Sequence, residues 1–299
     1  MTAPTRHGLL LLNKNSGVTS FDSLKAVKRT FGTQKAGHTG TLDKFASGLL
    51  LVLVGRGVKI APLFADCAKE YIAAVRFGME TDTLDPEGKV IAEGKVPSRE
   101  DVEAVLPAFR GSILQAPPAY SAIHINGKRA HELVRGGNEP LMKKRPVTIH
   151  ELEIISWTPP DAVIRVRCSA GTYVRSLARD MALAANSRGY LVALKRTRVG
   201  VFCLEDSVED TGDDETLAKA LRPLDRELFA ELSLPCFTID DTAAQGFING
   251  KSLKGLFPEP GGAAAAVFGN AASERAGRLL GILENRNGSW SYGHVFADS

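Results

Sequence analysis

Cysteine is scarce in this sequence, and the cysteines that occur are far apart. Among 299 residues there are four, namely Cys67, Cys168, Cys203 and Cys236. No two of them form the Cys-x-x-Cys pair that structural zinc sites usually contain, and no other metal or cofactor motif is present. We therefore expect reduced thiols, no metal site and no cofactor.

Long hydrophobic runs are also missing. A membrane-spanning helix needs about 20 consecutive apolar residues, and no segment approaches that length. The first apolar run, residues 9–12, is too short for the core of a secretory signal. We therefore expect a cytoplasmic protein, and a chain of 299 residues predicts one large domain with a smaller one.

Two glycine-containing segments resemble nucleotide-binding motifs but lack essential positions. Residues 250–252 read Gly-Lys-Ser, yet a phosphate-binding loop needs glycine where this chain has Gln245. Residues 55–57 read Gly-Arg-Gly without the third glycine of a dinucleotide fingerprint. Neither segment predicts nucleotide binding.

Hydrophobic periodicity indicates a chain of mixed helices and strands. Strands are expected at residues 8–13, 48–54, 69–77 and 162–168. The second of these is almost wholly apolar, which is typical of a central strand buried on both faces. Helices are expected at residues 20–32, 98–109 and 172–187, the first two beginning with the capping residues Ser20 and Ser98.

Other segments predict loops and a separate module. Residues 111–127 contain two prolines and a glycine and are expected to be irregular. Residues 205–216 carry seven carboxylates and no basic residue, which predicts a solvated surface loop. From about residue 235 short apolar runs alternate with glycine turns, which indicates a small β-rich module.

The most informative segment is a glycine- and threonine-rich loop, residues 37–48, that leads directly into the apolar strand. Asp43 is its only carboxylate, and a charge beside a buried segment is unfavourable unless it is paired or used. Aspartate in a turn more often hydrogen-bonds its own loop, and spacing alone favours that interpretation.

A resemblance to a known family favours a functional role for Asp43 instead. Residues 37–50 resemble the catalytic motif GHTGTLDPxASGLL of the TruB family of tRNA pseudouridine synthases, with Lys44 the only mismatch. Further segments resemble family motifs: residues 14–20 (KPxGxTS) before this loop, and residues 69–71 (KxY), 117–122 (PPxYSA), 168–177 (CSxGTYIRSL) and 194–198 (LRRTR) after it. Asn15 and Lys44 stand where family members usually have proline.

The resemblance implies an α+β pseudouridine synthase fold, with a mixed, mostly antiparallel sheet and a central cleft. It implies a catalytic domain at residues 1–232 and a PUA-like RNA-binding module at 235–299. The implied activity is isomerisation of uridine 55 in the T loop of tRNA to pseudouridine, by a monomer that needs neither a cofactor nor an obligatory protein partner. Two alternatives remain: an RNA-binding protein without catalysis, and a synthase that depends on guide RNAs and partner proteins.

The resemblance also implies roles for individual residues. Asp43 would be the nucleophile and Arg175 the cation that keeps it ionised. Tyr71 would stack on the flipped base and help remove the C5 proton. The remaining expected substrate contacts are His38, Tyr173, Leu194 and Lys14. Without the resemblance, Tyr71 would be an ordinary strand tyrosine, Arg175 a solvated helix residue and His38 a loop histidine.

Residues 124–150 predict a basic insertion that closes over RNA. They hold six basic residues against two acidic ones, whereas the whole chain has a net charge of only +3. The proposed RNA contacts are Lys128, Arg129, Lys143, Lys144 and Arg145. The alternative is a solvated surface loop, because basic clusters alone are a weak signal.

Overall fold

The computed structural model describes residues 7–121, 142–210, 212–270 and 277–296 in full, together with the backbone of two short strands between them. These strands are β8 (His124–Ile125) and β9 (Lys128–Arg129). The side chains of Lys128 and Arg129, which we expected to contact RNA, lie outside the described residues.

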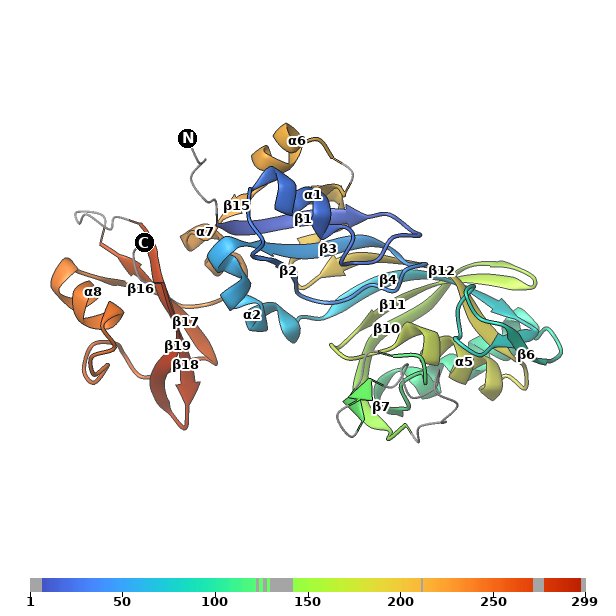
Figure 1. Ribbon diagram of the computed structural model, residues 1–299. Coiled ribbons are helices and arrows are strands. Elements are labelled where there is room, and N and C mark those ends of the chain that lie inside the picture. Colours follow the sequence, from blue (N-terminus) through green and yellow to red (C-terminus); the bar gives the residue numbers. More distant parts are fainter. Residues whose placement is uncertain are drawn as a thin grey trace.

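One large mixed sheet forms the centre of the molecule (Figure 1). Its main path follows the order β14-β1-β3-β12-β4-β11-β10-β7, and the parallel pairs are β1 with β14 and β3 with β12. The strands are β1 (Gly8–Lys14), β3 (Ser47–Val54), β4 (Lys69–Phe77), β7 (Gly111–Gln115), β10 (Arg145–Thr158), β11 (Asp161–Cys168), β12 (Gly189–Val199) and β14 (Val208–Glu209), with β2 (Ala36–His38), β13 (Phe202–Cys203) and β15 (Arg222–Pro223) pairing beside them. The predicted mixed, mostly antiparallel sheet is confirmed.

Short helices and a two-stranded hairpin make up most of the remaining described structure. The α-helices are α1 (Leu24–Thr30), α2 (Pro62–Ala65), α3 (Arg99–Val105), α5 (Val174–Ala184), α6 (Asp214–Lys219), α7 (Arg226–Glu231) and α8 (Asp241–Ile248). The 3-10 helices are η1 (Gly55–Ile60), η2 (Leu106–Phe109) and η3 (Leu204–Asp206), and the hairpin consists of β5 (Met79–Thr81) and β6 (Val90–Glu93). No helix within the described residues is long and apolar enough to cross a membrane.

Strand β3 is apolar because both faces of the sheet are covered around it. Alternate side chains of a strand point to opposite faces. Leu50 therefore packs in one core with Leu24 of α1, and Leu51 packs in a second core with Phe64 of α2. The expectation of a central strand buried on both faces is confirmed.

Helix α5 covers the other half of the sheet. Its apolar face contributes Leu177 and Met181, both fully buried, to a core shared with β4, β11 and β12. Gly189 allows β12 to begin against this helix, because a Cβ at that position would meet the Ala182 Cβ at 2.7 Å. This close packing holds the second half of α5 against the sheet, and Arg175 lies in the first turn of the same helix.

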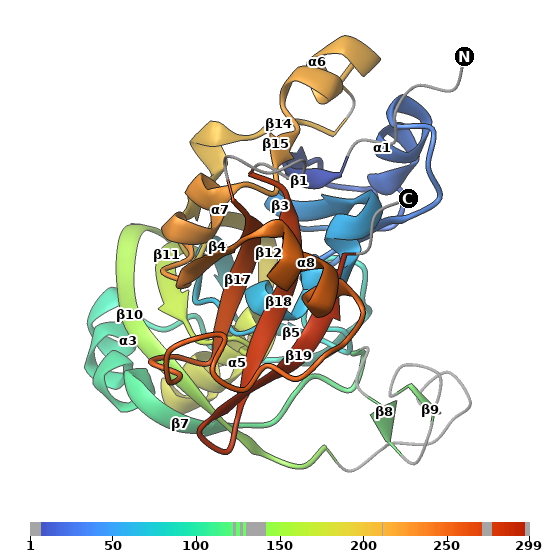
Figure 2. The same ribbon diagram turned by 90° about the vertical axis from the view of Figure 1, so that its left-hand side faces the viewer.

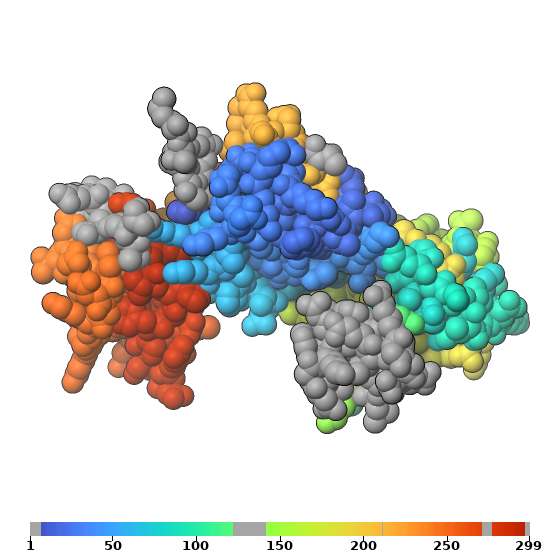
Figure 3. Space-filling model, in the orientation of Figure 1, coloured from blue at the N-terminus to red at the C-terminus, as the bar shows by residue number. Residues whose placement is uncertain are grey.

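A second sheet forms the C-terminal module. It has the order β16 (Cys236–Ile239), β17 (Ala264–Gly269), β18 (Leu279–Arg286) and β19 (Ser289–Val295). Helix α8 packs on one face, and Phe268 from the other face joins the core of β1 and β3. The module lies at one end of an elongated molecule and the β5–β6 hairpin at the other (Figures 1 and 3). Figure 2 views the molecule from the end that carries the module.

Three local expectations were wrong. Ser20 does not cap a helix, because α1 begins at Leu24 and the Ser20 hydroxyl instead bonds both the N–H and the C=O of Leu42. Residues 111–115 form β7, which pairs with β10. The acidic segment is not a solvated loop throughout, because β14 pairs with β1 and Asp210 is buried.

Candidate active site

A cavity of about 820 Å³ opens beside the centre of the large sheet, where β4 and β12 lie next to each other. That volume falls within the range of sites for small molecules, roughly 300–1,000 Å³. Four segments form its walls: residues 39–44, the turn at 83–87, residues 120–121 and the start of α5 at 171–175. Tyr71, Leu194 and Arg196 project into it from the sheet.

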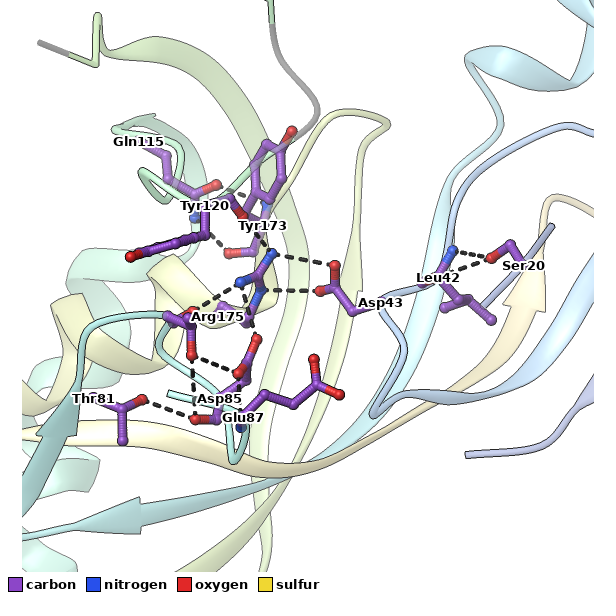
Figure 4. A network of polar contacts seen from close by, with 11 residues as sticks. Ser20, Leu42, Asp43, Thr81, Asp85, Glu87, Gln115, Tyr120, Tyr173 and Arg175 are labelled. Atoms are coloured by element: carbon purple, nitrogen blue, oxygen red, sulfur yellow. Dashed lines mark hydrogen bonds and ion pairs between the residues drawn. The ribbon is translucent and has the colours of Figure 1, made fainter. Parts of the chain in front are cut away.

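Asp43 and Arg175 meet in this cavity (Figure 4). Arg175 Nε lies 2.9 Å from Asp43 Oδ2, and Nη2 donates a hydrogen bond to Oδ1 at 3.2 Å. The Asp43 side chain is 39% exposed, so it faces the opening. The structure therefore brings together the two residues on which the sequence interpretation depended.

A second carboxylate fixes the other side of the guanidinium. Asp85 Oδ2 accepts a hydrogen bond from Arg175 Nη1 at 3.1 Å, and the side chains of Asp85 and Arg175 are only 7% and 5% exposed. The backbone carbonyls of Thr83 and Tyr120 accept two further hydrogen bonds from Arg175. A buried charge needs such partners, so Arg175 is held in one orientation.

The turn that carries Asp85 was missed by the sequence analysis. Its sequence, residues 81–88, has the composition of an ordinary surface turn, and its partner Arg175 lies 90 positions away. Leu84 is buried and has φ +62°, a conformation that L-residues seldom adopt and that recurs at functional sites. In this conformation both the Thr83 carbonyl and the Asp85 carboxylate reach Arg175.

Burial raises the pKa of the Asp43 carboxyl above its ordinary value of 3.8. The guanidinium of Arg175 opposes this rise, whereas the negative charges of Asp85 and Glu87 add to it. The expected cation is therefore present, but burial has the larger effect on the pKa. The ionised form of this carboxyl is the one that can act as a nucleophile.

Lys14 supports the loop from beneath and does not face the cavity. Its side chain is fully buried, and Nζ donates to the carbonyls of Asn15, Val18 and Ala46 at 2.6–2.9 Å. Burial lowers the pKa of this amine. The expected contact between Lys14 and RNA is contradicted by this position, because the ammonium is enclosed by backbone carbonyls.

Asn15 makes a contact that proline cannot make. Its backbone N–H and its Nδ2 both donate to the carboxylate of Asp210, at 3.3 and 2.7 Å. Ser23 Oγ donates to the same carboxylate at 2.7 Å. Because proline has no N–H, the replacement of the family proline is compensated here by a buried hydrogen-bonded aspartate.

Arg196 connects the loop to the sheet. Nε donates to the Leu49 carbonyl at 2.7 Å and Nη2 to the Gly40 carbonyl at 3.1 Å. Gly48, with φ +101°, lets the loop pass over β12, since a Cβ there would lie 2.3 Å from the Arg196 carbonyl oxygen. The backbone on both sides of Asp43 is thus fixed.

The expected pocket residues Tyr71, Tyr173 and Leu194 all line the cavity. Burial raises the pKa of the Tyr71 hydroxyl, so this phenol keeps its proton at neutral pH. Tyr173 is held through its backbone by Gln115, which accepts from its N–H at 2.8 Å and donates to its carbonyl at 3.1 Å. Gln115, almost fully buried, is another functional candidate that the sequence analysis did not find.

Other expected RNA contacts lie outside the cavity walls. His38 is half-buried on β2, and burial lowers the pKa of its imidazole. Lys143 and Lys144 are exposed just before β10. Arg145 donates to the Gly171 carbonyl at 2.9 Å, and its guanidinium lies 5.0 Å from the centre of the Tyr173 ring, so it supports the cavity wall. Within the described ranges no group of His, Cys, Asp and Glu is arranged to hold a metal ion.

The arrangement of strands matches that of the pseudouridine synthases. A chain in the crystal structure of a Cbf5-Nop10-Gar1 complex superposes with a TM-score of 0.67 at 24% identity, covering 98% of this chain and 84% of that chain. At this identity the likeness concerns the fold alone. It includes both sheets, and the fold is therefore a pseudouridine synthase fold with an additional C-terminal β module.

Sequence comparison identifies the branch of this class. The profile described as TruB family pseudouridylate synthase (N terminal domain) matches residues 28–174. The tRNA pseudouridine synthase B of Borreliella afzelii is 46% identical over 204 residues, which cover 67% of this chain and 72% of that protein. The tRNA pseudouridine synthase B of Azoarcus sp. is 40% identical over 287 residues, which cover 94% and 92%. The chain belongs to the TruB family of pseudouridylate synthases.

Proposed function

We propose that this chain isomerises uridine 55 in the T loop of tRNA to pseudouridine, with Asp43 as the nucleophile. The observation that carries the proposal is the pairing of Asp43 with the buried Arg175 at the mouth of an open cavity. The names of the relatives, tRNA pseudouridine synthase B, support tRNA as the substrate. Membership in the family makes the chain an isomerase.

The chemistry requires a nucleophile but no oxidant or reductant. Asp43 attacks the nucleotide at C1′ or C6, the N1–C1′ bond breaks, and the uracil rotates before C5 bonds to C1′. If Asp43 is bonded to C1′, formation of the C5–C1′ bond displaces its carboxylate; if it is bonded to C6, that bond is released by elimination afterwards. In both cases the C5 proton is lost and N1 gains a proton. Arg175 keeps its contacts to Asp85 throughout, so the carboxylate of Asp43 is presented in a fixed orientation.

The target uridine must leave its stack before Asp43 can reach it. Extruding a base requires a few kcal/mol, which contacts within the cavity offset. Tyr71 and Leu194 offer an aromatic and an aliphatic wall for the uracil, and Tyr173 closes a third side. Because the Tyr71 phenol is protonated, its oxygen takes part in C5 deprotonation only as a neutral acceptor.

Contacts outside the cavity hold the rest of the RNA. We assign residues 1–232 to catalysis, 235–299 to a PUA-like RNA-binding module, and the insertion expected at 124–150 to closure over the T arm, except for residues 145–150, which belong to β10 of the central sheet. The exposed Lys143 and Lys144 support the assignment of the insertion. His38 would occupy the place that the base leaves, or contact the RNA beside it. The chain would act as a cytoplasmic monomer without an obligatory protein partner.

Tritium release from a T-arm stem-loop labelled with [5-³H]uridine tests the proposal. The purified chain alone should release tritium, and Asp43→Ala should release none above background while still binding the RNA. A binding protein without catalysis would release none with either chain. A synthase that depends on guide RNA would act only after its partners are added, and either result would overturn the proposal.

A further inference from the structure

Lys44 directly follows the proposed nucleophile and lies at the mouth of the same cavity. Its Nζ lies 3.4 Å from Glu87 Oε1, and the two side chains are 54% and 48% exposed. Glu87 also lines the cavity, from the turn that carries Asp85. The pair therefore joins, at the solvent edge, the two walls that Arg175 joins further in.

This ion pair is poorly explained as a contact that holds the fold together. Exposed pairs of this kind contribute little to stability. The backbone of Lys44 is fixed in another way, because its carbonyl accepts a hydrogen bond from the Gly17 N–H at 2.8 Å. The backbone is thus held while the half-exposed ammonium remains free to exchange its partner.

A bound nucleotide brings an anion to this place. When C1′ of a ribose reaches the Asp43 carboxylate, the 5′ and 3′ phosphates of that nucleotide lie a few bonds away on the same sugar. Neighbouring Cα atoms are about 3.8 Å apart, and lysine carries its charge on a flexible four-carbon stem. The ammonium of Lys44 is therefore within reach of one of these phosphates.

We propose that Lys44 is a substrate-binding residue that exchanges its ion pair with Glu87 for a phosphate of the RNA beside the target uridine. The inference rests on the proposed function and assigns a role to a position where the family motif has proline. Glu87 holds the ammonium at the cavity mouth in the free protein. Its own charge repels the incoming phosphate, so it weakens binding.

The exchange predicts opposite effects for the two partners. Lys44→Gln should raise KM for a T-arm stem-loop about two- to fivefold with little change in kcat. It should also make the slope of log Kd against log salt shallower by about 0.7–0.9, the value of one phosphate contact. Glu87→Gln should lower KM and Kd, because the repelling charge is gone and Lys44 is unpaired.

A matched pair far from the cavity provides the control. Lys219 and Glu215 form an exposed ion pair on α6, and Lys219→Gln and Glu215→Gln should leave KM, Kd and the salt slope unchanged. If the ion pair of Lys44 and Glu87 only held the two walls together, both Lys44→Gln and Glu87→Gln would weaken RNA binding. That result would overturn the inference, and so would unchanged binding in both variants. The inference about Lys44 is tested by the Kd values, which do not depend on catalysis. Absence of tritium release by the wild-type chain would refute the proposed function but not this inference.

Discussion

The cavity and the C-terminal module bury different kinds of side chain. Around the cavity Lys14, Asp85, Arg175 and Arg196 are all at least nine-tenths buried. Among the described residues after Asp210, every buried side chain is apolar. The two regions are parts of one folded unit, since Phe268 of the module packs in the same core as β1 and β3.

The difference between buried charged and buried apolar side chains indicates where the functional site lies. Burying a charge is expensive unless each polar atom finds a partner, whereas burying alanine or phenylalanine is favourable in itself. Four of the five buried charged residues in the described part of the chain, Lys14, Asp85, Arg175 and Arg196, orient Asp43 or its loop, and the fifth, Asp210, holds Asn15 and Ser23. The described core of the module is apolar, so any contact that the module makes with RNA has to come from its surface.

The largest expected effect is the loss of Asp43. Asp43→Ala should lower kcat by about 10⁴-fold or more, as the removal of a nucleophile does in other enzymes. The fold should persist because Asp85 still pairs with Arg175. Single-turnover tritium release measures the loss, and filter binding checks that tRNA affinity is retained. Asp161→Ala, which breaks a partly exposed pair with Arg76, is the control and should keep full activity.

Loss of Asp85 should show whether this residue orients Arg175 for catalysis or only stabilises the fold. Asp85→Asn removes one charged partner of Arg175, so we expect kcat to fall about 10- to 100-fold with little change in KM. The free energy of unfolding should decrease by about 2 kcal/mol, because a buried charge-assisted hydrogen bond is weakened. Urea denaturation and tritium release measure both. A destabilised protein with unchanged kcat would show that Asp85 serves only the fold.

Residues whose environment is set by adjacent sequence could be predicted. The apolar run of β3 and the regular spacing along α5 correspond to the elements observed. Asp43 and Arg175 were paired through motif resemblance, and the structure places them in contact. Spacing alone would have left Arg175 as a solvated helix residue, because nothing local indicates that its side chain is buried.

Residues whose partners lie far away in the chain could not be predicted. Asp85 resembles a turn aspartate until packing brings α5 against it, and Ser20 resembles a helix cap until Leu42 takes its hydroxyl. Lys14 was expected to contact RNA because it begins a segment that resembles a family motif. Only the folded loop shows four backbone carbonyls around its ammonium within 3.5 Å.

The pH dependence should reveal the charges around Asp43. The ionised form is the nucleophile and burial raises the pKa, so activity should increase with pH through a value above 3.8. Arg175 lowers this pKa, whereas Asp85 and Glu87 raise it. Glu87→Gln should therefore move the acid limb of kcat/KM to lower pH. Glu151→Gln, on the exposed side of β10, is the control and should leave the acid limb of kcat/KM at the wild-type pH. If the acid limb stays at the wild-type pH in Glu87→Gln as well, Glu87 does not raise the pKa of Asp43.

The smallest effect on catalysis is expected from the core of the module. Phe247→Ala removes a fully buried ring that packs against Gly281, so the module should lose about 3–5 kcal/mol of stability. Because none of the described side chains of the module lines the cavity, kcat at saturating RNA should stay unchanged below the unfolding transition. Thermal denaturation and single-turnover assays at one temperature measure the two quantities, and Phe21→Ala, at an exposed ring, should alter neither. A parallel loss of kcat in Phe247→Ala would mean that the buried charges at the cavity depend on the apolar packing of the module, and the contrast between the two regions would no longer hold.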